Sequence, residues 1–245
     1  MLYFNPLEQF DITVFIPIFN SNLALTNIGC MVFFNLFLLY LFFYQYNTTI
    51  ALTNLNFLLN NIFSFIFTLI KDTIFFKNYS IILLLFYTFL FLFISNLIGM
   101  VPYSITITSH LILTLYLSLS FFIGTNLIGL LHLKQNYFIL FLPDGIPIPI
   151  IPILILIEYV SYFSKIFSLA IRLFANMMSG HILLKILIGF SWTLLNTNIL
   201  GIFVSFVPFF IVFCVIGLEF AIAFLQAYVF TILLIIYLND VLTPH

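Results

Sequence analysis

Most of the ionisable residues that could do chemistry in this sequence lie in its C-terminal half, at helical spacing. Glu158, Lys165 and Arg172 follow one another at steps of seven residues. Because successive residues of an α-helix are separated by roughly 100°, a step of seven returns to nearly the same face. One stripe about 21 Å long would therefore carry a carboxylate, an amine and a guanidinium. A second group of polar residues follows: Glu219, Gln226 and Asp240.

These residue types differ in what they can do with a proton. Arginine keeps its proton at all relevant pH values, so Arg172 can attract a carboxylate but cannot relay a proton. Glutamate, aspartate and histidine can exchange protons once burial or neighbours tune the pKa. A row of such groups beside one fixed cation is typical of a gated proton path. The alternative is a structural ion pair, in which Arg172 satisfies Glu158 or Glu219 and fixes helix packing.

The composition indicates that these groups lie in a membrane. Of the 245 residues, 64% are apolar and 5% are charged, the mean hydropathy is +1.31, and soluble domains have about 25% charged residues. A charged side chain at the bilayer centre costs about 2.5 to 3.5 kcal/mol, and an ion path is the default reason for it. The net charge of -1 offers no basic patch for nucleic acid.

The apolar runs predict an all-α polytopic fold of about five or six helices in one membrane domain. About 20 apolar residues suffice to cross a bilayer. Polar side chains at spacings of three and four indicate instead an amphipathic helix at the membrane surface. The predicted segments are an N-terminal segment at 1–27, a transmembrane helix at 28–46, an interfacial amphipathic helix at 55–70 and transmembrane helices at 80–98 and 110–131.

The last two apolar runs, 153–192 and 200–238, are too long for one perpendicular crossing. Forty residues of helix extend about 60 Å, whereas the bilayer core is about 30 Å thick. We therefore expect two strongly tilted helices that form a hairpin, with Pro208 as a possible kink. The prolines of 142–152 predict a turn before this hairpin.

Three lysines suggest the orientation. Lys71 and Lys77 precede the span at 80–98, and Lys134 follows the next one. If all three face one compartment, two crossings separate them, and the positive-inside rule assigns that side to the matrix or cytoplasm.

The sequence shows no pattern for catalysis or cofactor binding. It lacks a nucleophilic triad, a phosphate loop and zinc-type spacing, so we predict no metal, no cofactor and no enzyme activity of the chain alone. It also lacks the duplicated halves expected of a secondary transporter. A structural membrane subunit is the other alternative.

The segment SLAIRLFANMMSGH, from Ser168 to His181, surrounds Arg172 with small residues, of which Ala175 and Gly180 would let another helix come close. This segment resembles subunit a of F-type ATP synthases, called subunit 6 in mitochondria. The resemblance extends from Asn96 to Asp240. Its motif consists, in order, of Glu158, Ser168, Arg172, Leu173, Ala175, Asn176, Gly180, His181, Glu219, Gln226 and Asp240.

The resemblance implies a proton-translocating stator that faces a ring of c subunits through two offset half-channels and couples proton flow to rotation. Arg172 resembles the gate between the half-channels and the partner of each rotor carboxylate. The half-channel on the intermembrane-space side would be lined by Glu219, His181, Asn176 and Gln226. The matrix side would hold Glu158 and Asp240.

The same resemblance implies peripheral-stalk and accessory subunits, lipid and protons as partners, and the mitochondrial inner membrane as the location. A bacterial or plastid energy-converting membrane is the alternative. Two of the proton-path residues have an alternative interpretation. His181 could simply hydrogen-bond a neighbouring residue, and Asp240 could be a solvated acid at a helix end. Lysines at 165 and 185 could simply extend to the membrane surface.

Overall fold

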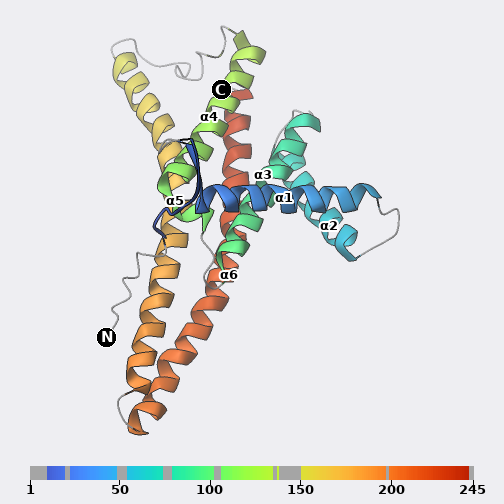
Figure 1. Ribbon diagram of the computed structural model, residues 1–245. Coiled ribbons are helices and arrows are strands. Elements are labelled where there is room, and N and C mark those ends of the chain that lie inside the picture. Colours follow the sequence, from blue (N-terminus) through green and yellow to red (C-terminus); the bar gives the residue numbers. More distant parts are fainter. Residues whose placement is uncertain are drawn as a thin grey trace. The chain divides into compact units, whose positions relative to one another are not determined.

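The computed structural model describes residues 10–19, 23–48, 54–73, 79–101, 106–134, 137, 150–196 and 199–242. Parts of the predicted N-terminal segment, Lys77 and most of the predicted turn at 142–152 lie outside these residues. The described residues form six α-helices (Figure 1): α1 Asn27–Thr48, α2 Asn54–Thr73, α3 Tyr79–Gly99, α4 Leu111–Leu133, α5 Ile151–Leu195 and α6 Ile199–Leu242. The predicted all-α fold is confirmed.

A short antiparallel strand pair precedes α1 and was not expected. Strand β1 (Val14–Phe19) pairs with β2 (Leu23–Thr26). The next residue, Asn27, starts α1 and joins it to the residues just before β1. Its side-chain amide donates to the backbone oxygen of Asp11 at 2.9 Å, and its side-chain oxygen accepts from the backbone N–H of Ile28 at 2.9 Å. Asparagine favours this position because its side chain satisfies a free N–H at a helix start.

Within the described residues, four helical stretches are long and apolar enough to cross a membrane: Ile81–Gly99, Leu111–Leu133, Ile151–Leu195 and Phe203–Leu242. Hydroxyls on these helices are satisfied locally. Thr88, for example, donates to the oxygen of Leu85 at 2.8 Å, and Thr125 donates to that of Phe122 at 2.9 Å. Such local bonding suits the interior of a membrane, where lipid chains can neither donate nor accept hydrogen bonds.

Helices α5 and α6 are the longest, as predicted, with 45 and 44 residues, which correspond to about 67 Å each. One detail differs from the expectation. The expected turn does not extend to Pro152, because α5 begins at Ile151 and proline is tolerated in a first turn, where the missing N–H has no helical partner. Pro208 lies inside α6, as the predicted helix over 200–238 implies.

The chain divides into two compact units, each built from several segments. The first unit comprises the described residues of Met1–Tyr40, Phe91–His110 and Leu173–Ala227. The second unit comprises those of Leu41–Leu90, Leu111–Arg172 and Tyr228–His245. Helices α5 and α6 each contribute one segment to each unit.

In the second unit, α2 packs against α3 through aromatic rings. Phe63 meets Phe86 edge to face, with ring centroids 5.2 Å apart, and Leu59 and Ile66 of α2 are buried. The polar residues Asn60, Asn61, Ser64 and Thr68 are exposed. This helix therefore has the amphipathic character that its sequence spacing indicates.

Candidate functional site

In the first unit, α5 and α6 run side by side (Figure 1) and exchange a polar contact. The side-chain amide of Asn176 donates to the Oε1 atom of Gln226 at 2.9 Å. Gln226 is 5% exposed. Two residues that the sequence assigns to one path therefore meet in space, although fifty positions separate them.

One turn further along α5, Gly180 lies against Glu219. A Cβ atom at Gly180 would lie 2.7 Å from Oε1 and 3.1 Å from Cδ of Glu219, so a larger residue here would force this carboxyl group to move. The Oε1 atom is buried and has no hydrogen-bond partner among the described residues. Buried polar atoms are nearly always satisfied, often by water. The Oε1 atom of Glu219 can therefore accept a hydrogen bond, for example from water.

A buried amide on α3 reaches the same stretch of α6. Asn96 is fully buried; its amide donates to the backbone oxygen of Ala223 at 3.3 Å, and its Oδ1 accepts from Thr108 at 3.0 Å. Ala223 lies between Glu219 and Gln226 in the sequence. Asn96 therefore joins α3, the 3₁₀ turn η2 (Ile107–Ser109) and α6.

The segment around η2 is a buried polar region that the sequence did not reveal. Thr106, Thr108 and Ser109 are buried, and Thr106 packs on Gly99. The Thr106 hydroxyl and the Nε2 atom of His110 are buried and have no hydrogen-bond partner among the described residues. Burial also lowers the pKa of His110. The dense Thr and Ser pattern of ITITSH was the available signal.

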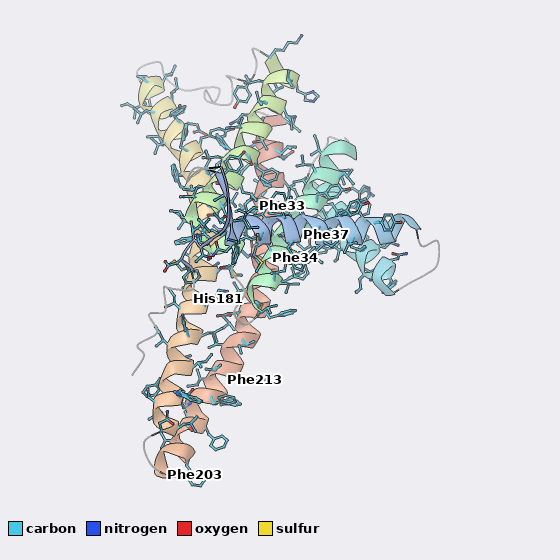
Figure 2. All side chains as sticks on the ribbon, in the orientation of Figure 1. Phe33, Phe34, Phe37, His181, Phe203 and Phe213 are labelled. Atoms are coloured by element: carbon cyan, nitrogen blue, oxygen red, sulfur yellow. The ribbon has the colours of Figure 1, made fainter. Side chains whose placement is uncertain are left out.

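His181, labelled in Figure 2, is partly buried on α5. It makes no hydrogen bond or ion pair with another described residue. Whether it serves Glu219 therefore stays a prediction.

Arg172 lies on α5 at the end of its segment of the second unit, and it is exposed. It forms no hydrogen bond or salt bridge with a described residue of its own unit, so the alternative of a structural pair with Glu158 is not formed there. On the N-terminal side, the exposed Ser161, Ser164 and Ser168 donate to carbonyl oxygens of α5 itself. The arginine thus follows a stripe of small side chains.

The second unit also holds the other predicted carboxylates. Asp240 pairs with Lys165, whose Nζ atom lies 3.5 Å from Oδ2, with the two side chains 46% and 34% exposed. Glu158 is partly exposed and makes no ion pair with a described residue. The structure therefore pairs Asp240 with Lys165.

Tyrosines that the sequence did not single out surround this pair. The Lys165 ammonium lies 5.1 Å from the ring centre of Tyr237 and 5.7 Å from that of Tyr162. Tyr162 donates its hydroxyl to Asn126 Oδ1, which also accepts from Tyr137 at 3.0 Å. The available signal was the spacing, since each ring lies three positions before a member of the ion pair. Among the described residues, no group of three metal-binding side chains occurs.

An apolar helical protein that carries carboxylates, amides and an exposed arginine on its two longest helices belongs to the class of ion-transporting membrane proteins. The comparisons with known proteins narrow this class. The family model described as ATP synthase A chain matches residues 12–239. The chain therefore belongs to the ATP synthase A chain family, whose members are membrane subunits of that complex and not its catalytic part.

Individual relatives agree with this assignment. The chain is 45% identical to ATP synthase subunit a of Chondrus crispus, covering 98% of this chain and 97% of the relative. It is 41% identical to that of Acanthamoeba castellanii, over 98% of both chains. It is 53% identical to that of Marchantia polymorpha over 60% of this chain and 58% of the relative.

Proposed function

We propose that this chain is the proton-translocating stator of the membrane sector of a mitochondrial F-type ATP synthase. It would face the ring of c subunits, form two offset half-channels with it and couple proton flow to rotation. The observation that carries the proposal is the exposed Arg172 guanidinium, which has no ion-pair partner among the described residues. Such a group in a membrane helix calls for an anionic partner, and a rotor carboxylate would supply one.

Arg172 would act as the gate. Its permanent charge attracts a carboxylate into the ionised form and cannot pass a proton on. A proton could therefore cross only when a rotor carboxylate carries it around the ring. The small residues Ser168 and Ala175, on the same face of α5 and also exposed, would let a rotor helix approach.

The uptake path would run through the first unit, on the intermembrane-space side. The buried oxygen of Glu219 beside Gly180 supports a role in proton exchange, and the Asn176–Gln226 hydrogen bond supports a polar path next to it. His181, on the same half of α5, would be a further proton carrier. The release path on the matrix side would use Glu158 and Asp240.

The remaining partners would be the peripheral-stalk and accessory subunits, and the location would be the inner mitochondrial membrane. Several protons would be needed for each ATP, because one charge moved through 100 mV releases about 2.3 kcal/mol.

The test compares wild type with Arg172→Ala in the whole synthase reconstituted into vesicles. We expect ATP-driven proton pumping to be lost while the detached catalytic head still hydrolyses ATP. The matched control is Lys71→Ala, which removes an exposed cation from the last turn of α2 and should leave pumping intact. Undiminished pumping by Arg172→Ala would show that the arginine is not the gate.

A further inference from the structure

The sequence places Lys165 on the stripe with Glu158 and Arg172, as a lysine that could extend to the membrane surface. The structure gives its ammonium three neighbours. Its Nζ atom lies 3.5 Å from Asp240 Oδ2, 5.1 Å from the ring centre of Tyr237 and 5.7 Å from that of Tyr162. We propose that Lys165 is a positioning residue that holds the Asp240 carboxylate in place for proton release. This inference rests on the proposed function of Asp240.

Each of the two helices supplies one tyrosine and one charged residue, at the same spacing. On α5, Tyr162 precedes Lys165 by three residues, and on α6, Tyr237 precedes Asp240 by three. Residues three apart on a helix are neighbours on its surface. Each helix therefore supplies one charge and one ring, and the ammonium lies close to both rings, as cations do when attracted to the negative face of an aromatic ring.

Further contacts with α4 hold the Tyr162 ring and the residue next to Asp240. The hydroxyls of Tyr162 and Tyr137 both donate to Asn126 Oδ1 on α4. On the same helix, Gly129 lets Val241 and Tyr137 come close, since a Cβ there would lie 2.1 Å from a Val241 methyl carbon and 3.1 Å from the Tyr137 ring. Because Val241 follows Asp240, α4 helps to set where this carboxylate lies.

The Lys165–Asp240 ion pair is partly exposed, and this exposure favours a positioning role for Lys165 over a role in stability. Ion pairs with side chains about one-third to one-half exposed contribute little to stability, because water screens them. The Lys165–Asp240 pair therefore holds the fold together only weakly. It does restrict one carboxylate oxygen, leaving the other available to accept a proton or a water hydrogen bond.

Correct placement matters for proton transfer, since a shift of about 1 Å in a reacting group can reduce a rate by about a hundredfold. We expect Lys165→Gln to lower the ATP-driven pumping rate of the whole synthase by about tenfold, within that range. Lys165→Arg should retain most of the activity, because guanidinium also binds carboxylates and aromatic faces. Lys71→Gln, with the same loss of charge at an exposed site of α2, should have no effect.

A double-mutant cycle with Asp240→Asn separates the possibilities. If Lys165 acts through Asp240, the double variant pumps no more slowly than Asp240→Asn alone, at equal amounts of assembled synthase. If the two losses multiply, or if Lys165→Gln pumps normally while Asp240→Asn is impaired, the positioning role is wrong and the proposed release path stands. If Asp240→Asn pumps normally, the assignment of Asp240 to the release path is itself wrong.

Discussion

Gly180 is the residue at which a single methyl group decides how Glu219 is placed. A Cβ atom there would meet the far end of the Glu219 side chain, 2.7 Å from Oε1. This end of the side chain is flexible, so the carboxyl group would move while the helices stay in place. The residue therefore controls the position of an ionisable group more than the stability of the fold.

We predict that Gly180→Ala lowers proton pumping by about tenfold, through displacement of the Glu219 carboxyl group, while the amount of assembled synthase is unchanged. Pumping in reconstituted vesicles measures the effect. The matched control is Gly189→Ala on the same helix, where a Cβ would meet no atom within 4 Å. Equal pumping by both variants would show that the close approach at Gly180 has no role in transport.

Among the elements, α3 is held to α6 by one buried side chain. Both polar ends of Asn96 are used, one on the backbone oxygen of Ala223 and one on the hydroxyl of Thr108. A buried amide of this kind specifies one packing arrangement, because any shift of the helices leaves its polar groups unpaired. Asn96 therefore bonds within the helix bundle.

We predict that Asn96→Ala destabilises the subunit by about 1 to 3 kcal/mol, since it leaves the buried Thr108 hydroxyl without its acceptor and removes the bond that ties α3 to the Ala223 oxygen. The measurement is thermal release of this subunit from the detergent-solubilised synthase. Ser120→Ala is the control, because that hydroxyl is exposed and bonds only to its own helix at Leu117. If the Asn96→Ala subunit is released at the same midpoint temperature as wild type, Asn96 does not anchor α3 to α6.

At the scale of the whole molecule, α3 and α4 are both long and apolar enough to cross the membrane. Lys71 lies before this pair of helices and Lys134 after it. If both helices cross, the chain returns to the same side, and the positive-inside rule predicts that this side is the matrix or cytoplasm.

We predict that cysteines introduced as Lys71→Cys and Lys134→Cys, with Cys30→Ala and Cys214→Ala to remove the native thiols, react with a membrane-impermeant maleimide from the same side. Inner-membrane vesicles of known orientation provide the measurement. Labelling of the two positions from opposite sides would mean that α3 and α4 make one crossing in total, and the predicted topology would be wrong.

The sequence alone was enough to identify a helical membrane protein, its two overlong helices and the Glu158, Lys165 and Arg172 stripe. These features depend on local hydrophobicity and on the helical period, both of which can be counted along the chain. Boundaries were less certain where local rules compete, as at Pro152, which a helix start accommodates although the proline-rich run predicted a turn.

Only the tertiary structure decided which side chains meet. The partners Asn176 and Gln226, Gly180 and Glu219, and Lys165 and Asp240 lie 50, 39 and 75 positions apart in the sequence. Such pairs depend on the register between two long helices, and many registers satisfy the same apolar pattern. Side-chain packing selects one of these registers. The helices can approach closely only where a glycine such as Gly180 lies, and a buried amide such as Gln226 must find a hydrogen-bond partner on the facing helix.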